Sequence, residues 1–183
     1  MLTLTTPPVG EPLSLPDAKA ALRVDHADDD ALISRMITTA RGLIERRLDL
    51  AILEQRWTLS LTDVPTQPVC LRPGKVREVT ATSVTYGSAT RPMTDGEFRL
   101  RRSVPATLML DVPPSENGDA LSAITVEFAA GWTADTVPPE LVHAVGLLTA
   151  HYYEERELFA RGRYVPVPTA LQTHIEAFRE VRL

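Results

Sequence analysis

Apolar residues recur every three or four positions in two stretches of the chain, which is the spacing of an amphipathic helix. The first stretch ends with Arg46, Arg47 and Leu48, and cations in a last turn favour the negative end of the helix dipole. The second follows Val137-Pro138-Pro139-Glu140, where prolines and an early carboxylate are typical of a helix start. The stripe of the first helix comprises Ile33, Met36, Ile37, Ala40, Leu43, Ile44 and Leu48.

Two shorter helices are predicted nearer the ends of the chain. Ser14 can cap a helix over residues 15–23, because a proline and an acidic residue follow it at early helical positions. A Gly- and Pro-bearing stretch over residues 162–168 precedes the other helix. That last helix carries Leu171, Ile175 and Phe178 on one side.

Between the long helices the pattern changes to the two-residue period of a half-buried strand. Residues 53–61 alternate apolar and polar side chains, and the sequence stays rich in strand formers and turn residues as far as Trp132. Further strands are predicted over residues 76–86, 97–102, 107–112 and 124–128. The pattern indicates an α+β protein, a small helical bundle with an inserted antiparallel β-rich region.

These elements set the expected domain boundaries. Residues 1–50 and 133–183 form the helical core, made of N-terminal helices, a central helix and a C-terminal helix, and residues 51–132 form the inserted region. A chain of 183 residues is long enough to bury a core of this kind by itself.

Composition narrows the class of protein. The single cysteine, Cys70, excludes an internal disulfide and a multi-cysteine metal cluster, and we expect synthesis in a reducing, intracellular compartment. We find no signal-like N-terminus and no apolar run long enough to cross a bilayer, so no membrane association is expected. The net charge of −5 disfavours tight wrapping around nucleic acid.

The charges are unevenly distributed along the chain. Residues 72–102 carry seven basic and three acidic side chains, whereas residues 103–157 carry nine acidic side chains and one arginine. Strand alternation places Arg99 and Arg101 on one face, with Arg102 at the edge. We interpret this row as a face that pairs with the acidic block, within or between subunits; a phosphate-binding stripe is the weaker alternative because aromatic residues are absent from it.

Residues 24–31 read VDHADDDA and look like a metal site. A Mg²⁺ or Ca²⁺ site needs carboxylates from several segments, or a loop with defined spacing and a glycine turn, and neither is visible. Asp28, Asp29 and Asp30 instead stand at the start of the long helix, where they are expected to accept backbone N–H groups. We therefore predict helix caps, with no metal and no cofactor.

No catalytic residue is predicted elsewhere. His143 and His151 lie eight positions apart on a helix, too far to share an ion, and Cys70 has no nearby base. Ser88 lacks the glycine that follows a nucleophile elbow, and Gly74-Lys75 lacks the rest of a phosphate loop. The sequence predicts that the protein is not an enzyme.

Several segments, taken in order, carry a resemblance to one family: residues 11–19, 22–25, 29–33, 55–59, 124–128, 130–132, 137–141, 150–156 and 178–182. They are spread over nearly the whole chain, and their ordered combination is what identifies the resemblance. Together they resemble the head–tail connector (adaptor) proteins of tailed bacteriophages and phage-like gene transfer agents, in the subfamily with a β-rich insertion.

The resemblance implies a structural protein that forms a ring, usually dodecameric, beneath the portal protein. Such a ring offers a platform for a head-completion (stopper) or tail protein, and DNA passes through its channel without specific binding. The protein would be located in the neck of the particle and be assembled in the bacterial cytoplasm. The resemblance further implies that His151 and Tyr152 are structural residues of the central helix and do not form a site.

The resemblance suggests one set of contact residues, and the charge pattern suggests a second. The C-terminal segment is expected to reach the portal through Leu171, Ile175, Phe178, Arg179 and Arg182. The charged blocks are expected to meet between subunits through Arg99, Arg101, Arg102, Glu154, Glu155 and Glu157.

One segment departs from the family pattern. Relatives carry a polar turn with Gly or Asn after the long helix, whereas this chain has Leu48-Asp49-Leu50-Ala51, so the alignment of this junction is open. Two other functions stay open as alternatives: a nucleic-acid-binding module that uses residues 72–102, and a small metal-dependent hydrolase built on His26 and its neighbouring aspartates.

Overall fold

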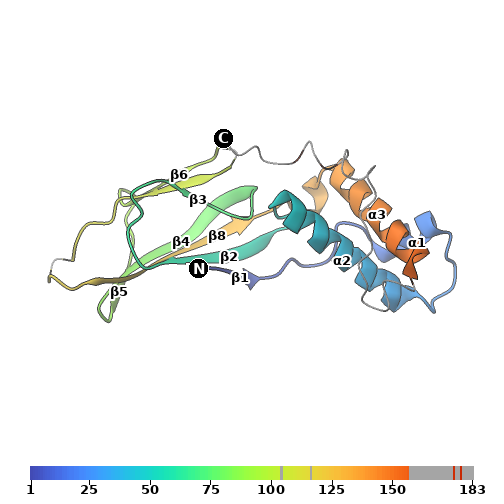
Figure 1. The fold of residues 1–183 in the computed structure, drawn as a ribbon, viewed down its shortest axis with the longest axis horizontal. Helices are drawn as coiled ribbons and strands as arrows, with labels where there is room; N and C mark the ends of the chain where they lie inside the picture. The colour runs from blue at the N-terminus through green and yellow to red at the C-terminus, as the bar shows by residue number, and fades with distance from the viewer. Residues whose placement is uncertain (104, 116, 157–174, 176–177, 179–183) are drawn as a thin grey trace. The chain divides into compact units, whose positions relative to one another are not determined.

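A computed structural model describes residues 1–103, 105–115, 117–156, 175 and 178 of the chain. The described residues contain three α-helices and eight strands in antiparallel sheets, which confirms the α+β class. The chain divides into two compact units. We call Met1–Pro8 with Glu54–Gly131 the β unit, and Val9–Leu53 with the described residues from Trp132 onward the helical unit (Figure 1).

A five-stranded antiparallel sheet is the larger element of the β unit. Apolar residues of neighbouring strands stand opposite one another on one face, as in the pairs Trp57↔Phe128 and Leu59↔Val126. Gly87, with a φ of 55°, closes the tight turn between the last two strands. In sheet order the strands are β1 (Leu2–Thr6), β2 (Gln55–Leu61), β8 (Leu121–Ala130), β4 (Val76–Tyr86) and β5 (Ala89–Pro92).

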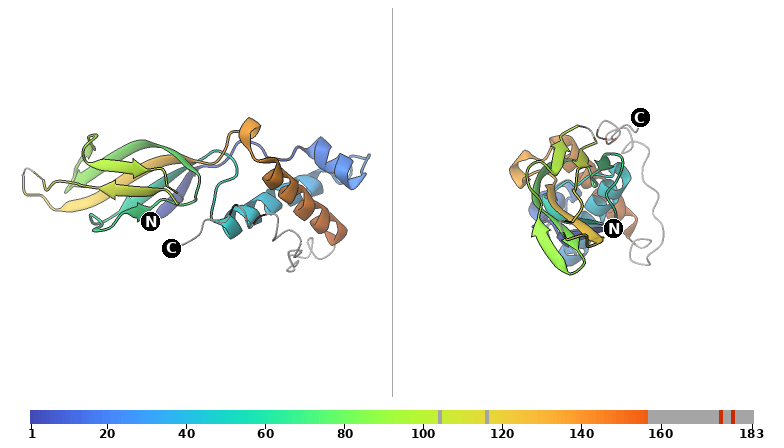
Figure 2. Two further views of the ribbon diagram at one scale, coloured as in Figure 1. Left: turned by 90° about the horizontal axis from the view of Figure 1, so that it is seen from above. Right: turned by 90° about the vertical axis from the view of Figure 1, so that its left-hand side faces the viewer.

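A smaller sheet, seen in two directions in Figures 1 and 2, lies over one face of the larger sheet. Its strands in order are β3 (Val69–Cys70), β7 (Thr107–Leu110) and β6 (Phe98–Arg101). Apolar residues of both sheets are almost completely buried: Leu71 and Leu108 on the side of the smaller sheet, and Val84, Val126 and Phe128 in the larger sheet. The alternation of apolar and polar residues therefore produces a β-sandwich core.

Three helices, α1 (Leu15–Leu22), α2 (Asp30–Leu48) and α3 (Pro139–Glu154), pack on one another in the helical unit. The Ser14 side chain accepts a hydrogen bond from the Asp17 backbone N–H at 3.2 Å, as its capping position predicts. The apolar stripes of α2 and α3 face the core, so these helices are stabilised mainly by burial. The core includes Ile33, Met36, Ile37, Ala40, Ile44, Leu48, Leu141, Ala144, Val145, Leu148 and Tyr152.

The junction after α2 has a defined backbone path. Asp49 ends the helix in the left-handed conformation that Gly or Asn usually adopts there, with a φ of 55°. The next four residues, Leu50 to Leu53, are buried, and Leu53 forms a bridge with Trp132. The expectation that the strand starts at Leu53 is therefore wrong, because this residue belongs to the helical core and β2 starts at Gln55.

Three strands, β1, β3 and β5, were not among the predicted elements. Leu2 and Leu4 alternate with threonines, and this short pattern forms β1, which pairs with β2. Met1–Pro8 consequently lie in the β unit, although the helical core was predicted to include residues 1–50.

Candidate assembly surfaces

The three aspartates at the start of α2 have separate partners. Asp29 occupies the cap position but makes no side-chain capping bond. Its carboxylate instead accepts a hydrogen bond from the Tyr153 hydroxyl at 2.6 Å, while Asp30 pairs with Lys19. The predicted side-chain cap by Asp29 is therefore wrong, because the phenol of α3 competes for its carboxylate. Asp28 is exposed and lies 3.8 Å from the His26 ring.

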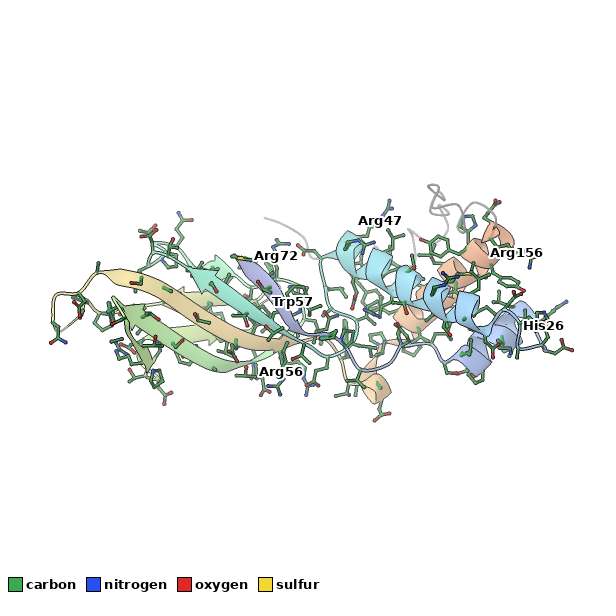
Figure 3. All side chains as sticks on the ribbon, turned by 90° about the horizontal axis from the view of Figure 1, so that it is seen from below. His26, Arg47, Arg56, Trp57, Arg72 and Arg156 are labelled. Atoms are coloured by element: carbon green, nitrogen blue, oxygen red, sulfur yellow. The ribbon has the colours of Figure 1, made fainter. Side chains whose placement is uncertain are left out.

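The contact between Asp29 and Tyr153 ties the start of α2 to the end of α3. The hydrogen bond to Asp29 raises the pKa of the Tyr153 hydroxyl, and burial and the charge of Asp29 act in the same direction. The Arg156 guanidinium lies 5.7 Å from the centre of the Tyr153 ring and 3.8 Å from the Asp29 carboxylate. His26 and Arg156 are labelled at this end of the unit in Figure 3. Among the described residues, no group of three or more His, Cys, Asp or Glu side chains is placed to hold a metal ion.

A second polar network in the helical unit was not predicted. The Arg41 guanidinium donates to Glu11 at 2.7 and 3.3 Å and to Glu45 at 2.8 Å. The other Glu45 oxygen accepts the Ile52 backbone N–H at 2.9 Å, and Thr38 also donates to Glu11. One arginine thus joins the segment before α1, the middle of α2 and the buried junction after α2. The only sequence signal was the four-residue spacing of Arg41 and Glu45 on α2.

Burial governs the electrostatics of this network. Burial raises the pKa of the Glu45 carboxyl, and the Ile52 N–H and the charge of Arg41 offset only part of that effect. Burial also acts to lower the pKa of Arg41, but its hydrogen bond to Glu11 and the charges of both glutamates raise it overall. The side chains of Arg41 and Glu45 are only 12% and 14% exposed, so the loss of one would leave the other in a largely buried site without this ion-pair partner.

The arginine row lies where strand alternation predicted it. Arg99 and Arg101 are exposed on β6, an edge strand of the smaller sheet, opposite Met109 and Thr107 of β7. Arg102 follows directly and is also exposed. None of these guanidinium groups has an acidic partner among the residues that the structure describes.

Other basic residues of the same block are neutralised inside the β unit. Arg77 pairs with Glu54, and Arg91 donates two hydrogen bonds, at 2.8 and 2.6 Å, to Glu97. Those bonds, together with the Thr94 backbone N–H, lower the pKa of Glu97 to about 2, although its burial acts in the opposite direction. Arg77 and Arg91 are therefore neutralised, in contrast to Arg99, Arg101 and Arg102, which have no acidic partner in the described part of the chain.

The acidic set is at the end of α3. Glu154 and Glu155 are exposed, and neither forms an ion pair within the described part of the chain. Glu157 lies outside the described residues. Within the described ranges, these carboxylates of the helical unit and the β6 arginines of the β unit have no ion-pair partner.

The residues expected to contact a portal are mostly outside the described residues; this applies to Leu171, Arg179 and Arg182. Ile175 is 3% exposed within the helical core, and Phe178 packs against that core. Their assignment to a portal contact stays a prediction.

The remaining candidate residues occupy ordinary structural positions. Tyr152 is buried in the helical core, His151 is half-buried and His143 is exposed. Cys70 is half-buried on β3 and is not in a disulfide. No helix among the described residues is both long and apolar enough to cross a lipid bilayer.

Comparison with known proteins gives a match to one family model and to several solved structures. A family model described as phage gp6-like head-tail connector protein matches residues 12–82, a span from the segment before α1 into β4. No curated protein matches the chain.

Three solved structures each contain a chain whose alignment with this protein covers 100% of this chain and 97% of the matched chain. A chain in the neck of an empty gene transfer agent (GTA) particle, computed with C6 symmetry, gives a TM-score of 0.79 at 25% identity. A chain in the neck of a native GTA particle, computed with C12 symmetry, gives 0.77 at 26% identity. A chain of a native GTA virion shares the fold, with a TM-score of 0.79 at 24% identity.

Proposed function

We propose that this head–tail connector protein, a structural subunit of a phage-like particle, forms a homo-oligomeric ring in the particle neck. The ring docks beneath the portal, extends the DNA channel and presents a platform for a head-completion or tail protein. Its role is to hold protein surfaces together, without catalysis. The observation that carries this proposal is the likeness of the entire chain to neck subunits of GTA particles.

The distribution of unpaired charge supports a ring. A closed ring requires two different, complementary faces on each subunit. Arginines on β6 and glutamates at the end of α3 remain unpaired among the described residues, and they lie on different units of the chain. Their charges are complementary, so each set can be neutralised by the other set on a neighbouring copy. Arg suits this role because its planar guanidinium pairs with carboxylates in a bidentate geometry.

The channel role agrees with the overall charge. Because the net charge is −5, the protein as a whole does not attract DNA phosphates and gains little affinity from the release of their counterions. DNA can therefore move through such a ring without being held. The pairing of Arg77 and Arg91 with glutamates reduces the positive charge of residues 72–102 further. A nucleic-acid-binding module would need this charge to remain free.

The two units have different parts in the proposed assembly. The helical unit is the connector core, a small bundle, and the β unit is an insertion between its N-terminal and C-terminal halves, to which the first strand contributes. The C-terminal segment reaches the portal, while the β6 row and the acidic end of α3 form the contact between subunits.

The test is assembly by the purified chain, measured by light scattering and electron microscopy with and without portal rings. We expect rings, or rings formed on the portal, and little retention on DNA at physiological salt. A protein that stays monomeric and ignores portal rings would contradict the proposal. Strong, salt-sensitive retention on DNA would favour the nucleic-acid-binding alternative.

Charge reversal tests the proposed contact between subunits. We expect R99E/R101E to prevent ring assembly, and the added reversal E154R/E155R to restore it, because complementarity is then rebuilt with opposite signs. Arg56→Glu is the matched control, since Arg56 is an exposed arginine on β2 of the same unit. If the control disrupts the ring as strongly as the double reversal, the β6 row is not the contact.

A further inference from the structure

We propose that β1 is a docking edge, to which a neighbouring copy of this chain adds an extended segment in the assembled ring. The inference rests on the proposed ring and names a backbone contact within it. Strand addition supplies main-chain hydrogen bonds, and side-chain pockets beside the edge supply selectivity.

The edges of the two sheets differ in how they are protected against unwanted pairing. Native edges are blunted by short length, by charged side chains, by proline or by bulges. Here β5 ends in Pro92 and carries Arg91, β6 carries two arginines, and β3 has only two residues. These three edges are poor templates for an added strand.

Strand β1 lacks most of these devices. Its residues, Leu2–Thr6, include no charged side chain and no proline, and every one of them is exposed. A register irregularity between Leu4 and Thr6 ends the regular pairing, which leaves Leu2–Leu4 as a regular edge against β2. Among the described edges, β1 is therefore the one best able to accept another strand.

The side chains beside this edge continue the apolar face of the sheet. Leu2 stands opposite Leu59, and Leu4 stands opposite Trp57, whose place on β2 is marked in Figure 3. The next residues across the sheet, Val126 and Phe128, are completely buried, whereas Leu2 and Leu4 are 39% and 41% exposed. The core face thus ends in an uncovered apolar margin, which a further strand would cover.

The chemistry of the margin identifies the occupant. DNA needs cations for its phosphates, and β1 provides none, so the margin is suited to an uncharged protein segment. In a ring each subunit is flanked by identical copies, and the solved neck chains that share this fold were computed with C6 and C12 symmetry. A second copy is therefore a partner that every subunit of the ring has next to it.

Site-specific crosslinking tests the contact directly. A photoreactive amino acid is placed at Leu4, or at Thr3 on the other face of the strand, and assembled rings or particles are irradiated. We expect a crosslinked product that contains this chain alone. A product with a different neck protein would overturn the proposed occupant, and the absence of any product at both positions would overturn the docking edge.

A charged edge provides the second test. We expect Leu4→Lys to raise the protein concentration needed for assembly on the order of tenfold, because lysine on an edge strand opposes pairing. Ser60→Lys is the control, because this exposed residue lies on the polar face of β2, one strand from the edge. If Leu4→Lys assembles like the control, the inference fails while the ring stands. If the unmodified chain forms no ring, the proposed function fails first.

Discussion

Replacement of Arg41 by leucine should destabilise the helical unit more than any other single charge removal on α2. The substitution keeps the aliphatic packing but leaves the Glu11 and Glu45 carboxylates facing each other without a cation. Exposed ion pairs contribute about 0–1 kcal/mol, whereas breaking a buried pair costs about 3–5 kcal/mol. Because the Arg41 and Glu45 side chains are mostly but not fully buried, we expect a loss of about 2–3 kcal/mol.

The assay is chemical denaturation followed by the helical circular dichroism signal, at protein concentrations below ring assembly. Arg41→Lys keeps the charge but not the forked geometry, so its loss should be smaller, about 1 kcal/mol. Arg35→Leu is the matched control, an exposed arginine on the same helix, and should change stability by less than about 0.5 kcal/mol.

The pH dependence of this variant separates electrostatics from packing. Without Arg41 the two carboxylates repel, so the pKa of Glu45, already raised by burial, rises further in the folded state. The folded variant then binds protons more readily than the unfolded chain, and lowering the pH restores part of its stability. The loss relative to the natural chain should therefore shrink from about pH 7 to about pH 4. A loss that is equal at both pH values, or no larger than that of Arg35→Leu, would refute the reasoning.

Three further predictions concern single side chains. Arg23→Gly should raise the free energy of unfolding by about 1 kcal/mol, because exposed Arg23 ends α1 with a φ of 57°, whereas Arg23→Ala should change little in the same denaturation assay. Glu97→Gln should make the stability of the β unit less dependent on pH. The pKa of Glu97 is lowered from 4.5 to about 2, so its carboxylate stabilises the folded β unit above pH 4.5 and loses this effect as the pH falls toward 2. The free energy of unfolding of the variant should therefore vary less over this range than that of the natural chain. Tyr153→Phe should lower the free energy of unfolding by about 1 kcal/mol, because it removes the hydrogen bond to Asp29. If the losses caused by Tyr153→Phe and Asp29→Ala are additive in a double-mutant cycle, the hydrogen bond contributes nothing.

The periodic elements could be predicted from the sequence because each buries a continuous face. The stripe from Ile33 to Leu48 became α2, and the Val- and Thr-rich run over residues 76–86 became β4 within the same bounds. The short edge strands were missed for the opposite reason. Residues in β1, β3 and β5 bury little, so their pairing depends on the neighbouring strand rather than on their own pattern.

The polar contacts were predictable only where they are local. Ser14 caps α1 because its partner is three residues away. Glu11 reaches Arg41 across 30 positions, and Tyr153 reaches Asp29 across 124, and no spacing rule covers such distances. Asp29 illustrates the consequence, since a residue correctly placed at a helix start was assigned the wrong hydrogen bond.

The two proposed contacts of the β unit act through different forces, and an assembling ring needs both. Charges on β6 attract a partner over a distance near the Debye length, about 8–10 Å in physiological salt, but exposed ion pairs add little to the final affinity. The uncharged edge at β1 attracts nothing at a distance, yet backbone hydrogen bonds and burial of Leu2 and Leu4 hold a partner once it arrives. Raising the salt concentration should therefore slow assembly, by weakening the approach, while leaving rings already formed largely intact. On this proposal, the exposed arginines of β6 speed the approach of a partner, and the uncharged strand β1 holds the partner afterwards.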